Sequence, residues 1–306
     1  HSLKEIISEA KAEQLGPFIK DTVPLLFENC DNEEEGVRNV VSECLGKLAL
    51  VDYDQVMPQL QKLLSDSELK RSTAISAVKY TITEQPRDTD DKLKKDLQTF
   101  LKLLNKNETV AVRRAAVLLL NSAAHNKPGL IVDSLDKILP NLYLETVFDE
   151  ALVRIIHYGP FKHRIDDGLE LRKSVFECLD SMLDQFKSRI DPNKFIAQLP
   201  NGLSDENDDI KMLTHLIVCK VAQAYPSSLT SSVDLLIPAI TKTLKKKEKE
   251  NAVAQEKERE VEVLRSALKA VAALKQLSGV EESSVQFVDL YQKTILADTR
   301  LKPLYD

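Results

Sequence analysis

The sequence predicts an all-α protein built from repeated helix pairs, with one β-hairpin inserted within a pair. Three observations support this prediction. The chain has 306 residues, 43% of them apolar, and only 8 glycines, so it can form a large core but has few of the turn residues that sheet folds need. Apolar side chains recur at helical spacing along most of the chain. A repeated unit is also visible in the sequence.

The repeated unit is a helix, a turn and a second helix. The segment 56–78, VMPQLQKLLSDSELKRSTAISAV, aligns with the segment 195–217, FIAQLPNGLSDENDDIKMLTHLI, and both carry Leu-Ser-Asp at the turn. In each copy a basic residue opens the second apolar helix. Six copies are predicted, with the basic residues Arg38, Arg71, Arg113, Arg172, Lys211 and Arg265.

The spacing of these basic residues indicates the repeat type and locates two insertions. They are 33, 42, 59, 39 and 54 positions apart, which brackets the roughly 40 to 47 residues of HEAT-type helix pairs. Because one pair cannot cover its own apolar face, we expect a single HEAT-repeat α-solenoid over residues 1–306. The long gaps place a hairpin insertion near 150–167 and a charged insertion near 245–261. Residues 283–306 are predicted to cap the last apolar face.

Prolines and polar turn residues complete the predicted unit. Four prolines are expected to lie inside first helices and to bend them by removing a backbone hydrogen bond: Pro24, Pro58, Pro140 and Pro238. Five polar residues are expected to cap the second helices and to pair with a basic residue of an adjacent repeat: Asp31, Asp66, Asn107, Asp167 and Asp205.

The first insertion departs from the helical pattern. Two β-prone runs, 153–158 and 161–165, flank Gly159 and Pro160, and the glycine can take the positive φ of a tight turn. The resulting register pairs Tyr158 with Phe161, His157 with Lys162, Ile156 with His163, Ile155 with Arg164 and Arg154 with Ile165.

A lone two-stranded ribbon is marginal in water, so this one must lean on its own solenoid or on a partner. Two interpretations are open: a loop packed against neighbouring repeats, or a wedge that enters a partner's groove. Tyr158 and Phe161 lie beside a cationic cluster. Because Tyr, Phe and Arg are the usual anchors of protein interfaces, this composition favours the wedge.

Composition also bears on the protein's class. The net charge of −6 argues against a general affinity for nucleic acid, which draws on a basic surface. No apolar run approaches the roughly 18 residues of a membrane span, and the start HSLKE is not a signal peptide. We expect an intracellular protein. A start without methionine indicates a processed or recombinant piece of a longer protein.

The sequence shows no catalytic, cofactor or metal constellation that stands out. Cys30, Cys44, Cys178 and Cys219 are scattered, as expected of reduced thiols, and the last three are predicted core residues on second helices. His157, His163, Asp166 and Asp167 are close in sequence, but strand pairing puts the two histidines on opposite faces. His125 and His215 are expected at a helix end and in the core. The lysines near 245–249 are followed by glutamates and are predicted to be a solvated charged segment.

Several segments also resemble a known family. GPFKHRIDDGLELRKSVFECLDSMLD, DIKMLTHLIV, AAHNKPGLIVDSLDKILPNLYLET, VRNVVSECLGKLAL and LRSALKAVAAL are similar to the C-terminal HEAT repeats of the cullin-associated, neddylation-dissociated family, also called the TBP-interacting protein 120 family. The resemblance extends in order over nearly the whole chain and includes both insertions.

The resemblance implies a function. In that family a HEAT superhelix wraps unneddylated cullin–RING ubiquitin ligases, its C-terminal part clasps the cullin N-terminal domain, and a hairpin occupies the surface where substrate-receptor adaptors bind. The chain is then expected to be a non-enzymatic regulator, cytoplasmic and nuclear, that acts with an N-terminal counterpart, linked or separate. It implies no cofactor and no nucleic acid or membrane as partner. The hairpin residues implied to contact the partner are Tyr158, Gly159, Pro160, Phe161, Lys162, His163 and Arg164.

A second function fits the same predicted fold. HEAT solenoids also serve as karyopherin-type transport receptors and as general scaffolds, and fold alone does not separate these roles. A pulldown separates them, because a cullin N-terminal domain is expected with the first function and a GTP-loaded small GTPase with the second.

Overall fold

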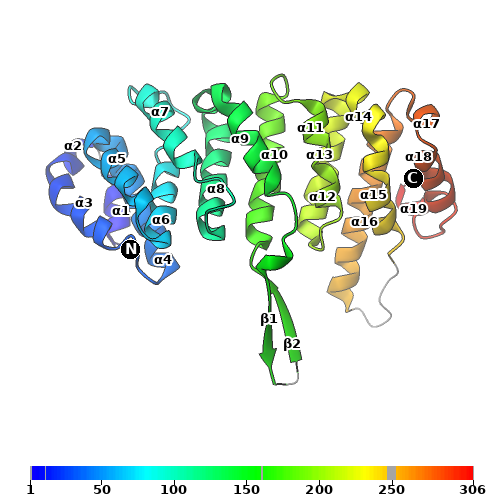
Figure 1. Ribbon diagram of the computed structural model, residues 1–306, viewed down its shortest axis with the longest axis horizontal. Coiled ribbons are helices and arrows are strands. Elements are labelled where there is room, and N and C mark those ends of the chain that lie inside the picture. The colour runs from blue at the N-terminus through cyan, green and yellow to red at the C-terminus, as the bar shows by residue number, and fades with distance from the viewer. Residues whose placement is uncertain (1, 11, 160, 247–252, 306) are drawn as a thin grey trace. The chain divides into compact units, whose positions relative to one another are not determined.

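The computed structural model describes residues 2–10, 12–159, 161–246 and 253–305. Its contacts fall into two compact units, residues 1–142 and 143–306. Each unit is a stack of antiparallel helix pairs, and one hairpin interrupts the second (Figure 1). The prediction of an all-α repeat protein with an inserted β-hairpin is confirmed, and its continuity as one solenoid over 1–306 stays a prediction.

The first unit contains three predicted helix pairs after a short N-terminal segment. Its helices are α1 (Ser2–Glu9), α2 (Ala12–Leu15), α3 (Ile19–Glu28), α4 (Glu35–Val51), α5 (Tyr53–Lys62), α6 (Glu68–Lys79), α7 (Asp90–Leu101) and α8 (Val110–Asn126), and α9 (Leu135–Leu144) begins in this unit. The second helices pack in order, α4 against α6 and α6 against α8. They present buried stripes to the core, such as Cys44, Leu45 and Leu48 on α4.

The second unit repeats this arrangement around longer second helices. Its elements are β1 (Val153–Tyr158), β2 (Phe161–Asp166), α10 (Leu169–Phe186), α11 (Pro192–Ile196), α12 (Leu199–Leu203), α13 (Asp208–Ala224), α14 (Pro226–Ser232), α15 (Ile237–Leu244), α16 (Ala254–Lys275), α17 (Val280–Ser283), α18 (Val285–Asp289), a π-helical turn η7 (Leu290–Ile295) and α19 (Lys302–Tyr305). Helix α10 packs on α13, and α13 packs on α16.

A glycine sets how closely the helices of the second unit approach. A Cβ atom on Gly202 of α12 would lie 2.2 Å from the Thr214 hydroxyl oxygen on α13 and 2.6 Å from the Phe176 ring on α10. Only a residue without a side chain fits there. Consecutive helix pairs are therefore in direct contact, and a change in one is felt by the next.

The predicted second helices are confirmed by position. All six basic residues that mark the repeat lie in α4, α6, α8, α10, α13 and α16, in that order. Three of the four prolines lie inside first helices, namely Pro24, Pro58 and Pro140. Pro238 also lies within its predicted first helix, α15, but in the first turn, where its missing N–H removes no helical hydrogen bond, so the bend predicted there is wrong.

The predicted capping residues are wrong. The hydroxyl or amide oxygen that accepts a hydrogen bond from the first turn belongs to Ser67 on α6, Thr109 on α8 and Asn207 on α13. Each of these residues directly precedes its helix, whereas the aligned acidic and amide residues lie further upstream, out of reach of the N2 and N3 amides. Two of these acids do pair with a basic residue of another repeat, Asp31 with Lys70 and Asp205 with Arg172.

The remaining insertion and the C-terminal segment are partly described. Residues 247–252 of the charged insertion lie outside the described residues, and α16 begins at Ala254. After it, α19 packs on α16 and the π-helical turn packs on α15, with Leu290, Ile295 and Leu301 buried. None of the described helices combines the length and apolar character needed to cross a bilayer.

Candidate functional site

The hairpin has the predicted register. Strands β1 and β2 are antiparallel, and the pairs run from Val153 with Asp166 to Tyr158 with Phe161. Gly159 has a φ of 60°, a left-handed conformation that glycine adopts without strain. Pro160 lies outside the described residues. The sequence therefore predicted both the ribbon and the glycine that turns it.

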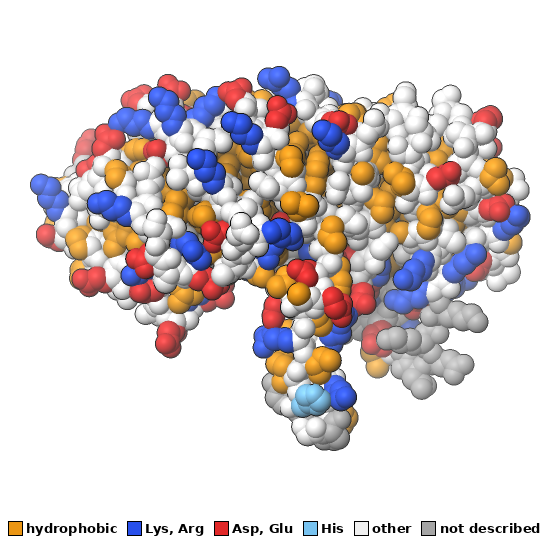
Figure 2. Space-filling model, in the orientation of Figure 1, with side chains coloured by type: hydrophobic (Ala, Val, Ile, Leu, Met, Phe, Trp, Pro, Cys, Tyr) orange, Lys and Arg blue, Asp and Glu red, His pale blue; other side chains and the backbone are white. Residues whose placement is uncertain are grey.

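The hairpin projects away from the ends of the helices of the second unit (Figure 1). The first four residues of β2 are exposed, and only Ile165 and Asp166, next to α10, are half-buried. Phe161 is 68% exposed and Ile155 is 60% exposed, which is unusual for large apolar side chains. Apolar, cationic and histidine side chains lie together on the projecting ribbon in Figure 2. The outer half of the hairpin is thus available to a partner.

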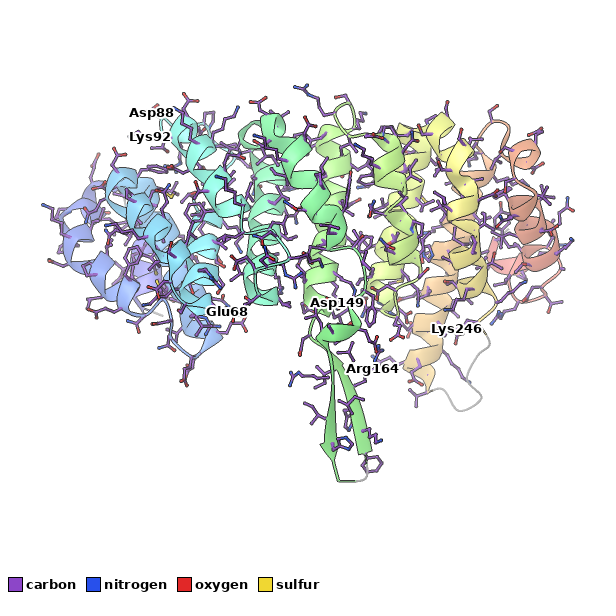
Figure 3. The ribbon with its side chains drawn as sticks, in the orientation of Figure 1. Glu68, Asp88, Lys92, Asp149, Arg164 and Lys246 are labelled. Atoms are coloured by element: carbon purple, nitrogen blue, oxygen red, sulfur yellow. The ribbon has the colours of Figure 1, made fainter. Side chains whose placement is uncertain are left out.

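The implied contact residues that the structure describes differ in position and exposure. Phe161, Lys162 and His163 are exposed on the outer half of β2. Tyr158 is paired through its backbone with Phe161, and its side chain is not described. Gly159 forms the turn. Arg164 is different, because it lies toward the attached end of the hairpin, as Figure 3 shows.

A buried arginine fixes the base of the hairpin. Arg172 on α10 is 3% exposed and donates from Nη2 to Asp166 Oδ2 at 2.8 Å and from Nε to Asp205 Oδ2 at 2.8 Å. Asp166 is the last residue of β2, and Asp205 lies in the turn between α12 and α13. One guanidinium group therefore joins the hairpin, its own helix and the next helix pair. We call Asp166, Arg172 and Asp205 the base clamp.

The protonation of the base clamp follows from this geometry. Partial burial by itself raises the pKa of Asp166, but the hydrogen bonds and charge of Arg172 outweigh it and hold that pKa below its ordinary value. The backbone N–H of Gly168 also donates to Asp166 Oδ1 at 3.0 Å. The carboxylate is therefore charged at neutral pH, and the clamp is an ion pair and not a neutral hydrogen bond.

A second, exposed set of contacts surrounds the base clamp. Arg164 of β2 pairs with Glu206, in the turn before α13, and with Glu150, just before β1. The guanidinium groups of both Arg164 and Arg172 lie over the ring of Phe148, at 5.4 and 4.9 Å from its centroid. Arg164 thus orients the ribbon against two neighbouring segments. Sequence reasoning missed Glu150, Phe148 and Glu206.

The chain leaves the hairpin through a tight corner. Arg154 of β1 makes a two-point ion pair with Asp167, at 2.6 and 3.1 Å. A Cβ atom on the next residue, Gly168, would lie 2.9 Å from Leu152 Cδ1 and 3.3 Å from both Arg172 Nη1 and Asp166 Oδ1. The DDG sequence after β2 therefore serves the corner, and its glycine lets α10 begin directly under the ribbon.

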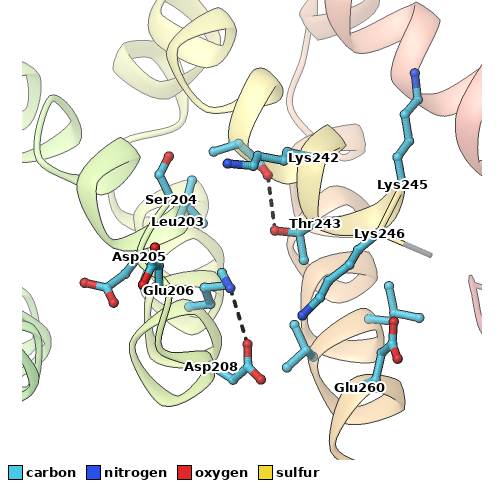
Figure 4. Close-up of a pocket in the computed structure, with 14 residues that line it drawn as sticks. Leu203, Ser204, Asp205, Glu206, Asp208, Lys242, Thr243, Lys245, Lys246 and Glu260 are labelled. Carbon is cyan, nitrogen blue, oxygen red and sulfur yellow. Dashed lines mark hydrogen bonds and ion pairs between the residues drawn. The ribbon is translucent and has the colours of Figure 1, made fainter. Parts of the chain in front are cut away.

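A cavity of about 590 Å³ adjoins the base clamp. Asp205 and Glu206 lie on one wall, from the turn before α13, and Lys242 and Lys246 lie on the other, from α15 and the residues after it (Figure 4). Apolar side chains also line it, among them Leu203, Val263 and Leu264. Charges of both signs line the walls, so the cavity has no strong preference for an anion or a cation.

The reactive residue types lie elsewhere and are mostly buried. The described cysteines are unpaired; Cys44 and Cys178 are buried, and burial raises the pKa of each thiol. Their prediction as core residues is confirmed, while Cys219 is half-buried. His215 is also in the core, where burial and then the charge of Lys211 lower its pKa to about 4.

In the described part of the chain, no group of three His, Cys, Asp or Glu side chains is placed to hold a metal ion. The register confirms that His157 and His163 face opposite sides of the ribbon, because they pair with Lys162 and Ile156 at adjacent positions. What the site offers is an oriented, exposed surface.

Relatives of the chain share its sequence over nearly its full length. The protein named Cullin-associated NEDD8-dissociated protein 1 of Dictyostelium discoideum is 40% identical over 301 residues, which cover 96% of this chain and 24% of that protein. Its namesake in Arabidopsis thaliana is 42% identical over 288 residues, 92% of this chain and 24% of that protein. The chain spans about a quarter of the length of these relatives.

Two further comparisons concern a shorter relative and the fold. A protein of Emericella nidulans named Cullin-associated NEDD8-dissociated protein 1, C-terminal part, is 34% identical over 244 residues, 79% of this chain and 23% of that protein. Among solved structures, a designed armadillo repeat protein superposes with a TM-score of 0.52 at 16% identity, over 82% of this chain and 99% of that one. The latter supports the helical-repeat fold alone.

The family follows from a further match. The family model described as TATA-binding protein interacting (TIP20) matches residues 130–295, a range that contains the whole hairpin and its base clamp. This range is more than half of the chain. The names of the relatives above agree with the family that the sequence segments resemble. The chain belongs to the TATA-binding protein interacting (TIP20) family, which the cullin-associated, neddylation-dissociated resemblance had indicated.

Proposed function

We propose that the chain is a non-enzymatic, cullin-associated regulator whose hairpin binds the cullin N-terminal domain and competes with a substrate-receptor adaptor. The observation that carries the proposal is the pairing of an exposed apolar tip with a fixed base. The names of the relatives, cullin-associated and NEDD8-dissociated, support a cullin as the partner. Because the chain matches about a quarter of those proteins, the remaining activity of a whole family member is also a proposal.

The chemistry of the tip defines the groove that would receive it. Phe161 and Ile155 lie on opposite faces of the ribbon, so a groove must offer apolar contact on two walls. Lys162 adds positive charge next to Phe161, which favours an acidic rim. A flat ribbon with stiff side chains loses little entropy when it docks, because the base clamp already sets its direction.

Competition follows from shared space. An adaptor and the hairpin cannot occupy one groove together, so each lowers the apparent affinity of the other. The hairpin has no catalytic role in this scheme. It acts by occupying a surface, and its effect depends on its concentration and on how long it stays bound.

The proposal is tested by a competition among this chain, a cullin N-terminal domain and a labelled adaptor. The expected result is displacement of the adaptor by the wild-type chain and no displacement by a variant in which residues 155–164 are replaced by a Gly-Ser loop of equal length. Circular dichroism checks that the variant keeps its helices. Retention of the adaptor at saturating wild-type chain would refute the competition.

The same mixture tests the proposed N-terminal counterpart. A second footprint on the cullin, linked or co-assembled, raises the effective concentration of the hairpin. Adding the counterpart is therefore expected to lower the concentration of this chain that displaces half of the adaptor. An unchanged midpoint would contradict a two-part clasp. In parallel, a pulldown with a GTP-loaded small GTPase tests the transport-receptor alternative, for which the proposal expects no binding.

A further inference from the structure

A narrow polar groove crosses the second helices of the first unit, far in sequence from the hairpin. It has a volume of about 160 Å³ and is lined from α4, α6 and α8. Pockets for small molecules are typically about 300–1,000 Å³, so this groove is the size of one or two side chains. Its walls are rich in hydroxyl and cationic groups, among them Ser72, Ser76, Lys79, Tyr80 and Arg114.

The central cation of this groove lacks a counter-ion. Lys79 is half-buried, and its ammonium lies 4.7 Å from the centre of the Tyr80 ring. Within the described part of the chain no carboxylate forms an ion pair with it. Burial, and then the charge of nearby Arg114, lower the pKa of Lys79. The groove therefore holds a partly desolvated positive charge beside a second one.

Nearby acidic groups do not neutralise this charge. Glu43 acts on Lys79 only at a distance and is itself paired with Lys4 and Lys47. Glu35, the acidic residue in the groove lining, is exposed at the start of α4. Across the groove, Arg38 adds a further cation and donates to the backbone carbonyl groups of Asn32 and Glu33. Cations outnumber acids in the lining by three to one.

Hydroxyl groups complete the requirements of an anion site. Ser72 and Ser76 lie one turn apart on α6, on the same side as Lys79, and all three line the groove. The Ser72 hydroxyl donates to the Leu69 carbonyl oxygen at 3.0 Å, so its oxygen faces the groove as part of a polar wall. A carboxylate that enters would meet the Lys79 ammonium and the Ser76 hydroxyl, a cation and a neutral donor that together make charge-assisted hydrogen bonds. A larger anion does not fit, because the volume admits only the end of a side chain.

We propose that this groove, the Lys79 groove, binds the carboxylate of a Glu or Asp side chain on an acidic segment of a partner protein. The inference goes beyond the proposed function, because it requires neither the hairpin nor its partner. The occupant is argued from charge complementarity and size: a half-buried, unpaired cation gains most from a carboxylate that enters the groove with it. The groove is thus a second contact surface, with a specificity of its own.

The experiment uses the full chain and hexaglutamate as the probe, with hexaglutamine as the neutral control. NMR signals of the Lys79 side chain and the Tyr80 ring are followed during the titration at low salt. The expected result is a saturable shift of both signals with hexaglutamate and none with hexaglutamine. Lys79→Met is expected to weaken hexaglutamate binding about tenfold.

Two controls separate the groove from general charge attraction. Lys62→Met removes one exposed charge from α5 and is expected to leave the affinity within about twofold. Lys79→Met is expected to leave the melting temperature unchanged or to raise it, because the half-buried charge forms no ion pair and a methionine side chain can still pack on the Tyr80 ring. Equal affinities of the two variants, or no shift at Lys79, would overturn the inference. A larger shift with inorganic phosphate at equal charge would overturn the carboxylate assignment.

Discussion

The base of the hairpin is held by buried ion pairs, whereas its outer part exposes apolar side chains. At the base, Arg172 is almost completely buried and both of its carboxylate partners are in place. Beyond the base, Phe161 next to the turn and Ile155 in the middle of β1 are mostly exposed. Less than one strand length separates the two regions.

This difference teaches how a two-stranded ribbon can be exposed and still useful. Alone, such a ribbon is marginal in water, and an apolar tip would favour collapse onto the nearest surface. The base clamp prevents this by holding the last residue of β2 against two helix pairs. The free energy that orders the tip therefore comes from the base, and the tip residues remain available for a partner.

The sharpest way to break the comparison is to remove the cation of the base clamp. Arg172→Met leaves the carboxylates of Asp166 and Asp205 without the cation that pairs with both, and Asp205 is 5% exposed. Removing one member of a buried ion pair typically costs about 3–5 kcal/mol, so we expect a loss of that size in urea denaturation.

Two control variants separate the effect of losing a buried arginine from the effect of losing any arginine. Arg259→Met removes an exposed arginine paired with Asp209 and Glu262, and is expected to cost less than about 1 kcal/mol. Adding Asp205→Leu to Arg172→Met should restore part of the stability, because one uncompensated charge is removed as well. Equal losses for Arg172→Met and Arg259→Met would contradict the importance of the clamp.

At the tip, the expected effect is on binding and not on folding. Phe161→Ala truncates a side chain that is 68% exposed, so the free energy of unfolding should change by less than about 0.5 kcal/mol. If Phe161 is an interface anchor, its loss weakens cullin binding by about 2 kcal/mol, measured by titration calorimetry. Val285→Ala, at an apolar residue 78% exposed on α18, is the matched control and should bind as the wild type does.

The corner between the two regions is expected to tolerate little added volume. Gly168→Ala places a methyl group 2.9 Å from Leu152 Cδ1 and against the base clamp, which we expect to cost about 1–2 kcal/mol. Gly36→Ala on α4 meets nothing within 4 Å and should stabilise the protein slightly, since alanine favours helix. Thermal denaturation of both variants gives the comparison, and a shift of the same sign in both would argue against crowding at Gly168.

Acid is expected to weaken the base clamp through Asp166. The pKa of Asp166 is lower in the folded protein than its ordinary value of 3.8, so the stabilising ion pair is fully present above about pH 4. It is lost as the pH falls through the lower, folded pKa. Urea denaturation between pH 6 and pH 2 is expected to show this loss in the wild type and a flatter curve in Asp166→Asn. Parallel curves would mean that Asp166 contributes nothing through its charge.

The smallest effect on stability is expected at Arg164. Its guanidinium is exposed and its partners, Glu150 and Glu206, are exposed too, so Arg164→Met should leave the melting temperature unchanged within error. The hairpin should nevertheless become less ordered, because two of its tethers are gone. Backbone ¹⁵N order parameters of 153–166 measure this. A ribbon as rigid as in the wild type would assign its direction to the base clamp alone.

Much of this organisation could be predicted from the sequence because it rests on local patterns. The six second helices follow from spacing and apolar stripes, and the register of the hairpin follows from one Gly-Pro loop. The pairing of Asp205 with Arg172 was also accessible, since the repeat alignment placed acids where an adjacent basic residue could reach them.

The contacts that could not be predicted join residues that are far apart in the sequence. Glu206 is 42 residues from Arg164, and no spacing rule joins them. Arg164 belongs to the implied contact residues by its place beside the tip, yet it pairs with its own chain, so its contact with a partner stays a prediction. The capping residues were missed for a geometric reason, because a side chain caps only from the position directly before the helix.

The dependence of the hairpin on Asp205 has a practical meaning for anyone who cuts or grafts this protein. A fragment that ends after α10 keeps every hairpin residue but lacks the acid that holds Arg172 from the following repeat. Such a fragment would keep the exposed side chains of the hairpin, but the direction of the ribbon would no longer be fixed. Transplanting the recognition element therefore means moving residues from Phe148 to the start of α13 as one piece.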